Sequence, residues 1–538
     1  MTRTISPLQL RERLDGGGEL ALLDVREEGV FARNHLFWAT CLPLSRLELR
    51  IRDLAPRFGA PIVVCDGGEG LAETAAGRLG AWGYNEVYVL AGGLSGWEAE
   101  GFSLYSGFNV PSKAFGEFVE HQYETPSVSP EELHEMLESG RDMVILDSRP
   151  MDEYSRMNIP AGVNVPGGEL VYRVHNMAPD PSTLVVVNCA GRTRSIIGAQ
   201  SLINAGIPNQ VTALRNGTMG WHLAGLELER GKARTAPDPS AQSIAQAQEA
   251  AQGVAKRFGV RFIDYPTLQG WMDEGGDRTL YVLDVRIPEE YESGHMPGVR
   301  NAPGGQLAQA TDTFMATRGA RVVLVDSHQV RATMAASWLI QMGWREVFVL
   351  EDGQLPFGLE QGPHQPEIPG LDGIEVEELS PGELAQELDD PDLNDSEGPV
   401  VVDLALSPTY RKGHIPGAWF AIRTDLPQAL PKLPQGRPLV LASPDGIHAR
   451  LTAPEAAAIW QGPVLVLTGG TNAWRAMGLP LEEGDDRLAS EPVDVHPKPY
   501  DHASGQEQAM RDYLTWEVDL VHRVEKDGEA RFEPFPKE

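Results

Sequence analysis

The sequence places one cysteine where it could act as a nucleophile. Cys189 follows an apolar run at residues 185–187 and Asn188, and a short loop with Arg192 and Arg194 comes after it. Residues 196–205 then have the composition of a helix. A helix N-terminus and nearby guanidinium groups favour the thiolate over the thiol, so a cysteine at such a junction is more reactive than a free one. This arrangement predicts an activated nucleophile.

The strand and loop around Cys189 belong to one copy of a pattern that occurs four times. Each copy opens with an apolar strand that ends in aspartate, at Asp24, Asp147, Asp284 and Asp403. A short block with histidine or proline follows, at residues 35–39, 158–162, 295–299 and 414–418. A second strand and its loop come next, at 62–70, 185–194, 322–331 and 439–448. A third strand, a turn and an aromatic residue close each copy, at 87–97, 211–221, 347–357 and 464–474. The interval between copies is the size of one compact domain.

Helical stretches separate the strands within each copy. They lie at residues 73–82, 195–205, 332–342 and 454–460. Alternating strands and helices are typical of a parallel sheet that is covered by helices on both faces. We therefore predict an α/β protein made of four domains in tandem.

Composition and charge narrow the functions that the chain could have. It has 538 residues, enough for several domains, and a formal net charge of −32, which repels nucleic acids and anionic membranes. It contains no apolar run of the ~18–20 residues that cross a bilayer, and its N-terminus lacks the apolar core of a signal peptide. Three cysteines form no disulfide framework and lack metal-site spacing, so we expect a cytoplasmic protein without a metal. In so acidic a chain, clustered arginines indicate a site for an anion.

The four sets of motifs together resemble the rhodanese superfamily of sulfurtransferases. They are Asp-x-Arg, His-Ile-Pro-Gly-Ala, the cysteine loop and Gly-Gly-x-x-x-Trp, and they extend over residues 5–484. The resemblance implies four rhodanese-like domains, each with a doubly wound five-stranded parallel sheet, and an active-site loop that carries a cysteine persulfide. The expected domains are residues 1–108, 125–232, 256–362 and 374–484, with a linker at 233–255 and a C-terminal extension at 485–538. No cofactor is implied.

The residue at the start of each loop separates the four copies. In the family, a competent domain has cysteine as the first residue of this loop. Alignment on the preceding strands places Asp66, Cys189, Asp326 and Ser443 at that position. Neither aspartate nor serine can carry a transferable sulfane sulfur. We therefore expect one reaction centre, in the second domain, and three inactive domains.

The length of the Cys189 loop favours sulfur over phosphate chemistry. Four residues separate Cys189 from Arg194. Cysteine phosphatases, and the phosphatase-like relatives of the family, have five residues there because their loop must surround a tetrahedral phosphate or arsenate. The shorter loop suits a single sulfur atom, and this argues against a phosphatase or an arsenate reductase.

Substrate binding is expected from the loop and from one arginine outside it. The amides of Ala190, Gly191, Arg192, Thr193 and Arg194 would form a nest for an anion, and the two arginines would bind an oxyanion donor. Arg149 matches the family position from which an arginine reaches the donor. The alternative roles are that Arg194 braces the loop and that Arg149 pairs with Asp147 or Glu153. Gly191 stands one position earlier than the usual family glycine, so the sequence leaves open which loop side chain faces the donor.

Three further residues are interpreted as structural. Asn158 stands where the other copies have histidine, and we interpret this as a variation without a change of substrate. Cys65 ends a strand and is expected to be a buried apolar residue rather than a resolving thiol. Cys41 is assigned to a loop and is also expected to be structural.

These observations lead to one main hypothesis and two alternatives. The main one is a ping-pong sulfurtransferase, in which Cys189 takes sulfane sulfur from thiosulfate or a related small anionic donor and passes it to a thiol, a protein thiol or cyanide. The first alternative is a persulfide carrier or scaffold with little small-molecule turnover. The second is mercaptopyruvate as the donor.

Two segments outside the repeats are expected to be helical. Residues 243–255 are rich in Ala and Gln, although the surrounding linker could instead be flexible. In the C-terminal extension, Ala509, Tyr513, Leu520 and Val524 have approximately helical spacing after Ser504, which could cap the helix. We expect that helix to lie against a neighbouring domain rather than to bind a partner.

Overall fold

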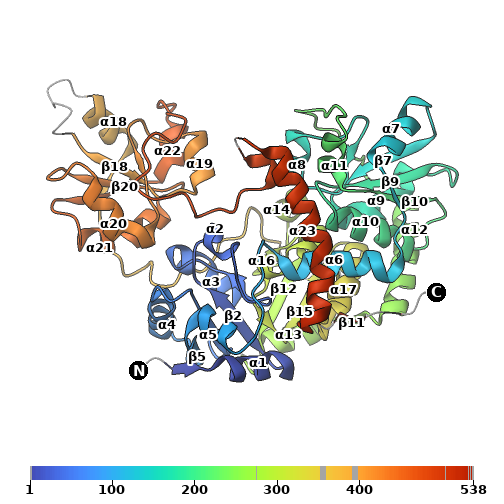
Figure 1. Ribbon diagram of the computed structural model, residues 1–538, viewed down its shortest axis with the longest axis horizontal. Helices are drawn as coiled ribbons and strands as arrows, with labels where there is room; N and C mark the ends of the chain where they lie inside the picture. The colour runs from blue at the N-terminus through green and yellow to red at the C-terminus, as the bar shows by residue number, and fades with distance from the viewer. Residues whose placement is uncertain are drawn as a thin grey trace.

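Four parallel sheets, one for each sequence repeat, form the core of the computed structural model (Figure 1). The structure describes residues 3–273, 276–351, 359–389, 398–502, 504–530, 532–533 and 535. In every sheet the strands lie in the order first, fifth, fourth, second and third along the chain of that repeat. The predicted α/β class with four five-stranded parallel sheets is therefore confirmed. The closing block expected at residues 347–357 lies partly outside the described residues.

We call the four repeats the first to fourth units, and their strands are as follows. The first unit has β1 (Arg3–Ile5), β2 (Leu20–Asp24), β3 (Thr40–Cys41), β4 (Ile62–Cys65) and β5 (Val87–Leu90). The second has β6 (Ser127–Val128), β7 (Met143–Asp147), β8 (Val163–Asn164), β9 (Leu184–Asn188) and β10 (Val211–Leu214). The third has β11 (Arg261–Ile263), β12 (Leu280–Asp284), β13 (Arg300–Asn301), β15 (Arg321–Val325) and β16 (Glu346–Leu350). The fourth has β17 (Glu377–Leu379), β18 (Val400–Asp403), β19 (Trp419–Phe420), β20 (Leu439–Ala442) and β21 (Val464–Leu467).

Helices follow the strands in each unit. The first unit has α1 (Pro7–Gly16), α2 (Glu28–Phe31), α3 (Leu47–Leu54), α4 (Leu71–Ala81) and α5 (Gly93–Ala99). The second has α7 (Pro130–Glu138), α8 (Met151–Arg156), α9 (Leu170–Met177), α10 (Thr193–Asn204) and α11 (Gly217–Leu223). The third has α13 (Tyr265–Asp273), α14 (Pro288–Ser293), α15 (Gly304–Gln309), α16 (Thr311–Phe314) and α17 (Val330–Gln341). The fourth has α18 (Pro381–Asp389), α19 (Ser407–Lys412), α20 (Leu426–Ala429), α21 (Ile447–Ala457) and α22 (Gly470–Ala476).

Each sheet is buried on both faces by helices. Side chains of successive strand residues point to opposite faces, so both sets are apolar. In the second unit, Val185 and Val187 pack with Leu170 of α9 and Leu202 of α10. On the other face, Val186 packs with buried Trp221 of α11. Strand β9 is therefore apolar along its length, and only its C-terminal end reaches a loop that can carry chemistry.

The first sheet contains a sixth strand, which comes from the third unit. The short strand β3 pairs with only the C-terminal part of β2. Strand β14 (Thr317–Arg318) pairs antiparallel with the rest of that edge, at Ala21 and Leu20. An unpaired sheet edge exposes backbone hydrogen-bonding groups, so β14 completes an edge that β3 leaves half open.

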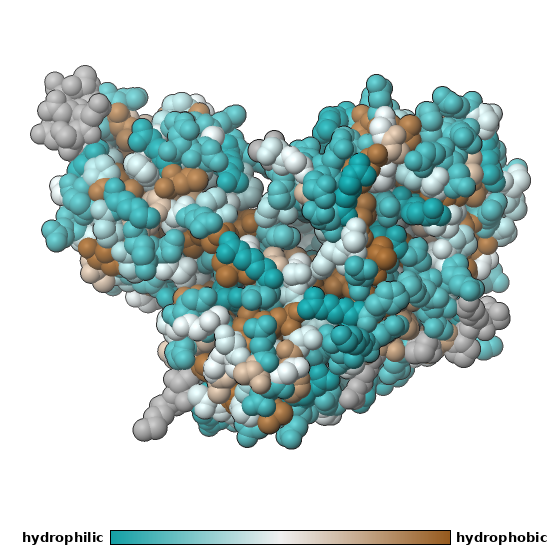
Figure 2. All heavy atoms as spheres, in the orientation of Figure 1, coloured by the Kyte–Doolittle hydropathy of each residue, from teal (hydrophilic) through white to brown (hydrophobic). Residues whose placement is uncertain are grey.

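Besides the β14 contact between the first and third units, two further interfaces join the units. The second and third approach so closely that a Cβ on Gly305 would lie 2.8 Å from the Cα of Gly167. Helix α12 (Ala241–Phe258) packs on α9 and α17 across this pair, so the helix expected within the linker is present. The first and fourth units are joined by ion pairs that include Glu48 and Arg423, 3.0 Å apart. The face of the molecule shown in Figure 2 is predominantly hydrophilic.

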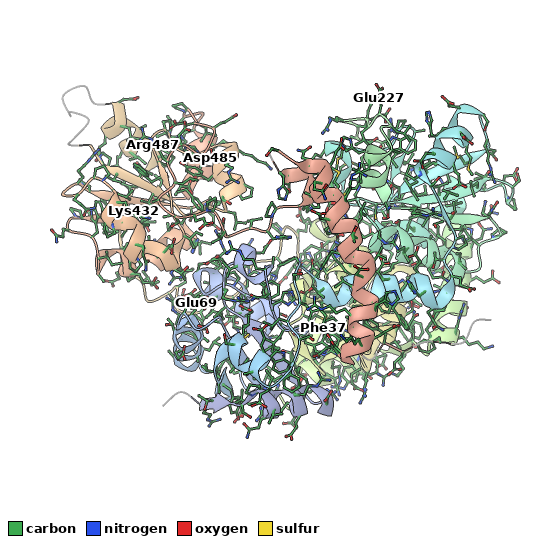
Figure 3. All side chains as sticks on the ribbon, viewed as in Figure 1. Phe37, Glu69, Glu227, Lys432, Asp485 and Arg487 are labelled. Atoms are coloured by element: carbon green, nitrogen blue, oxygen red, sulfur yellow. The ribbon has the colours of Figure 1, made fainter. Side chains whose placement is uncertain are left out.

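The C-terminal extension returns from the fourth unit and crosses the middle of the molecule. It forms the short helix η5 (Pro499–Asp501) and then α23 (Gln506–Asp527), which crosses α6 (Val110–Tyr123) in Figure 1. Leu520 and Val524 pack with Phe37 of the first unit, which lies near the C-terminal end of α23 (Figure 3). The docked helix is thus present, but the suggested cap at Ser504 is wrong: Gly505 occupies the N-cap with a φ of 69° and makes no side-chain cap. Among the described residues, no helix is long and apolar enough to span a bilayer.

Candidate active site

Cys189 lies directly after β9, between β7 and β10 in the middle of the second sheet. Its side chain is buried, and Sγ lies 3.5 Å from Oγ of Ser195. Ser195 in turn donates a hydrogen bond of 2.8 Å to the carbonyl of Arg192. The site is at the C-terminal end of a parallel strand and at the N-terminus of α10, where α/β proteins bind ligands.

The backbone of the loop is held by the turn that precedes α11. The carbonyl of Cys189 accepts two hydrogen bonds of 2.8 Å, from the amide and the hydroxyl of Thr218. Gly217 makes this approach feasible, because it has a φ of +54° and a Cβ there would lie 2.4 Å from the same carbonyl oxygen. Neither Thr218 nor Gly217 was expected at the site from the sequence; the signal for both is the glycine-rich turn in each repeat.

Five amides of the loop point to anion binding. The amides of residues 190–194 donate to no acceptor among the described residues. Successive free amides at a helix N-terminus attract negative charge, through both their N–H groups and the helix dipole. This loop therefore offers donors to a thiolate, a persulfide or a bound oxyanion.

Arg194 lies at the cleft and shares one carboxylate with a lysine. Its guanidinium donates to both oxygens of Glu153 on α8, at 3.2 and 2.8 Å. Lys498 of the C-terminal extension donates to the same carboxylate at 3.1 Å. Burial raises the pKa of Glu153, but the two cations lower it more, so the net shift is well below the usual range. The group of Arg194, Lys498 and Glu153 therefore carries one net positive charge in the cleft that Cys189 lines.

Arg192 and Arg149 have other carboxylate partners. Arg192 donates to both oxygens of Glu117 on α6, at 2.7 and 2.8 Å, and also to Glu120. Burial raises the pKa of Glu117 to about 7, against the lowering effect of Arg192. Arg149 is fully buried and pairs with Asp147 at 2.6 Å, and it is not among the residues that line the cleft. Arg149 therefore takes the alternative position that the sequence left open.

A cleft of about 590 Å³ opens onto Cys189, and most of its wall comes from outside the second unit. Its lining includes the loop residues Ala190 to Arg194, residues 106–109, Lys113 of α6 and residues of the C-terminal extension. The extension contributes charged and aromatic side chains, namely Lys498, Tyr500, Tyr513, Trp516 and Glu517. Sequence reasoning missed all five as site residues, because nothing in a segment without a repeat indicates which distant loop it covers.

Glu517 makes the most direct contact between the extension and the cysteine loop. It is buried, and its Oε1 accepts a hydrogen bond of 2.5 Å from the hydroxyl of Thr193. Lys113 lies 3.7 Å from the same oxygen, whereas Oε2 has no hydrogen-bond partner among the described residues. Burial also raises the pKa of neighbouring Tyr513 well above its ordinary value.

The corresponding loops of the other units contain their own acceptor. In the first unit, the carboxylate of Asp66 accepts from the amides of Gly68 and Ala72, at 2.9 and 3.0 Å. In the third, Asp326 accepts from the amide of Arg331 at 2.9 Å. In the fourth, the hydroxyl of Ser443 accepts from the amide of Ala449 at 3.2 Å. Among the four loops, only that of Cys189 lacks such an internal contact within the described residues.

The three residues interpreted as structural have structural contacts. Asn158 donates to the carbonyl of Tyr154 at 3.2 Å, and His295 and His414 make the equivalent contact at 2.8 Å in their units. Cys41 is the last residue of β3, so its assignment to a loop is wrong. Burial raises the pKa of Cys65 and of Cys41 well above the usual range. Neither cysteine is therefore activated. Among the described residues, no group of three or more His, Cys, Asp or Glu side chains could hold a metal ion.

The fold and the loop define a class of α/β domain with a single cysteine at the head of a helix. The family model of the rhodanese-like domain matches residues 6–100, 129–224, 266–355 and 380–477. The chain therefore belongs to the rhodanese family, with four domains of this type.

Individual relatives support the assignment over different lengths. The crystal structure of a thiosulfate sulfurtransferase from Pseudomonas aeruginosa is 48% identical, with a TM-score of 0.94, and the alignment covers 99% of this chain and 100% of that one. Uncharacterized protein YqhL of Bacillus subtilis is 35% identical over 83 residues, which are 15% of this chain and 64% of that protein. The HTH-type transcriptional regulator Rv0324 of Mycobacterium tuberculosis is 30% identical over 100 residues, 19% of this chain and 43% of that protein. The chain thus spans less than two thirds of each of the last two relatives.

Proposed function

We propose that this protein is a sulfurtransferase that moves sulfane sulfur from thiosulfate, or a related small anionic donor, to a thiol or cyanide through a persulfide on Cys189. The observation that carries the proposal is the loop itself. A cysteine stands at the base of five amides that have no acceptor among the described residues. A relative that is 48% identical over nearly the whole chain is described as a thiosulfate sulfurtransferase.

The first half-reaction loads the cysteine. The Cys189 thiolate, favoured by the dipole of α10 and by Arg194, attacks the outer sulfur of thiosulfate. A new S–S bond forms at Sγ while the original S–S bond breaks, and its electron pair leaves with sulfite. The loop amides stabilise the negative charge of the persulfide that remains. The second half-reaction is the transfer of that outer sulfur to the acceptor.

The loop arginines have separate roles in this proposal. Arg194, with Lys498, provides the positive charge that attracts the anionic donor to the cleft, since Glu153 neutralises only one of the two cations. Arg192 is held by Glu117 and Glu120, so it fixes the loop to α6 instead of binding the donor. Arg149 fixes the end of β7 through Asp147.

In this proposal the other three units have no catalytic role and contribute only to the structure. Their loops contain an aspartate or serine that accepts hydrogen bonds within the loop, so they offer no thiol to load. The three cysteines of the chain are all unpaired, as thiols in a reducing compartment are, and we assign the reaction to the cytoplasm. The acceptor could be a small thiol or a thiol on a partner protein.

Mass spectrometry after incubation with thiosulfate tests the proposal. One additional sulfur is expected on the peptide that contains Cys189, and none is expected in Cys189→Ser. An equal adduct in both proteins would refute the assignment. Steady-state assays with thiosulfate or mercaptopyruvate as donor, and cyanide as acceptor, then identify the donor. A persulfide that forms without turnover would favour the carrier alternative.

A further inference from the structure

The cleft is larger than a small inorganic donor requires. Its volume of about 590 Å³ lies within the range of about 300–1,000 Å³ that is usual for sites of small organic molecules. Aromatic side chains from the extension, Tyr500, Tyr513 and Trp516, line the cleft, and Tyr513 lies against Gly191 of the cysteine loop. This space admits an organic thiol as acceptor, and such an acceptor brings a proton that must be removed before its sulfur can attack.

Glu517 lies where it could take that proton. A Cβ on Gly191 would be 3.4 Å from Oε2, so the unpaired oxygen lies against the loop two residues after Cys189. The other oxygen accepts the hydroxyl hydrogen of Thr193, and Thr193 itself lines the cleft. A threonine hydroxyl can receive one proton while it donates another, so Thr193 and Glu517 form a route from the cleft to a carboxylate.

We propose that Glu517, acting through the hydroxyl of Thr193, is the proton acceptor for thiol substrates in the second half-reaction. This inference rests on the proposed sulfurtransferase function and assigns a role to the C-terminal extension, which lies outside the residues that the family model matches. A buried carboxylate is suited to this task because a general base acts when it is positioned within hydrogen-bond reach of the proton.

The step balances without an external reactant. The thiol proton passes to the hydroxyl of Thr193 as that hydroxyl gives its own proton to Glu517. The acceptor thiolate then attacks the outer sulfur of the Cys189 persulfide and forms a new S–S bond. The bond between that sulfur and Sγ breaks, and its electron pair stays on Sγ. The protonated Glu517 returns the proton through Thr193 to the departing persulfide product, and Cys189 is left as the thiolate that begins the next loading step.

An acceptor without a proton separates this role from a purely structural one. In mildly alkaline buffer, sulfite is a dianion that can remove the outer sulfur by reversing the loading step, with no proton to lose. The decay of preformed Cys189 persulfide is therefore measured in single turnovers by mass spectrometry, with either 2-mercaptoethanol or sulfite as acceptor. Glu517→Gln should slow decay with 2-mercaptoethanol by about 10²-fold and should not slow decay with sulfite.

Matched variants complete the test. Thr193→Val should show the same selective loss and Thr193→Ser should retain the wild-type rate, because serine keeps the hydroxyl. Glu507→Gln, at an exposed position on the same helix, should change neither rate. Equal slowing with both acceptors would mean that Glu517 only positions the loop, and unchanged rates with both would mean that it has no role; either result overturns the inference. Failure of the wild-type protein to form a persulfide would instead refute the proposed function.

Discussion

The loops of Cys189 and Asp66 begin at the same point of the fold. They differ in whether the first side chain of the loop accepts hydrogen bonds from the amides that follow it. Each follows a central strand, β9 or β4, and the carbonyl of its first residue accepts an amide from the glycine turn, Thr218 in one unit and Leu94 in the other. Asp66 directs its carboxylate onto amides of its own loop and helix. The loop of the first unit therefore lacks a thiol, and its aspartate also accepts the amide hydrogen bonds that a bound anion would need.

The two loops also differ in what surrounds them. Residues 67–70 of the first unit are exposed, and Glu69 lies on the side of that unit away from α23 (Figure 3). The Cys189 loop is instead enclosed by α6, η5 and α23. Electrostatic interactions are stronger where water is excluded. The enclosing elements therefore strengthen the attraction between the amides of the cysteine loop and an anion, and the repeat motif alone does not provide this effect.

Exchanging the first residue of each loop should produce the largest effect. Cys189→Ser should lower thiosulfate turnover by at least about 10³-fold, because no other residue can carry the sulfur. Asp66→Cys should form no persulfide at position 66, since the first unit has Leu71 where the second has Arg194 and lacks the enclosing elements. Turnover by the double variant, or a persulfide at position 66, would show that the motif alone defines the site.

Both loops pack against a glycine with a positive φ, and replacing this glycine should destabilise either unit. Gly217 and Gly93 have a positive φ, and a Cβ at either would lie 2.4 or 2.6 Å from the carbonyl of Cys189 or Asp66. Gly217→Ala should lower the free energy of unfolding by at least about 2 kcal/mol, from backbone strain and the clash together. Gly225→Ala is the control, because that glycine also has a positive φ but has nothing within 4 Å of its Cβ position. Equal losses in thermal unfolding would attribute the effect to φ alone.

Much of the fold could be predicted from the sequence because it depends on local patterns. Strands such as β9 are continuous apolar runs that end at a polar loop, and these runs recur four times in the same order. The single cysteine among the four aligned loop positions could be identified in the same way. The helix of the C-terminal extension was also predictable from the spacing of Leu520 and Val524.

The surroundings of the loop could not be predicted, because they depend on contacts between distant segments. Thr193 and Glu517 are 324 residues apart, and nothing in either segment indicates their 2.5 Å hydrogen bond. The partner of Arg192 is equally remote from the motif, since Glu117 belongs to α6 between two units. A motif thus identifies a charged side chain, whereas the partner that determines its role comes from the tertiary structure.

Replacing Arg194 by the residue of the first unit should weaken donor use. Arg194→Leu removes a cation from the mouth of the cleft, and hydrogen bonds to charged groups contribute about 1.5–3 kcal/mol, which corresponds to a loss of roughly 10- to 100-fold in kcat/KM for thiosulfate. Turnover of an uncharged donor should change less. Arg215→Ala is the control, since this arginine of the same unit is exposed and does not line the cleft; it donates to Ser127 Oγ. Unchanged kinetics in Arg194→Leu would remove Arg194 from the donor site.

Replacing Glu153, the carboxylate partner of Arg194, should give the smallest effect. It should appear as a change in how stability depends on pH. The first unit has Val30 and Leu71 where the second has Glu153 and Arg194, so this ion pair distinguishes the two loops. Arg194 and Lys498 hold the pKa of Glu153 well below its ordinary value of 4.5. The folded state therefore binds this proton less readily than the unfolded chain, and the stabilisation is present above that ordinary value and is lost as the pH falls below it.

Glu153→Gln removes this contribution and should make Tm fall less steeply as the pH is lowered from about 6 to about 3. Glu507→Gln, at an exposed site on α23, should retain the wild-type slope and controls for the loss of one carboxyl group. Identical slopes for Glu153→Gln and the wild-type protein would show that Glu153 gains nothing from its two cations on folding. The charge pair would then serve donor binding alone and would contribute nothing to the stability of the second unit.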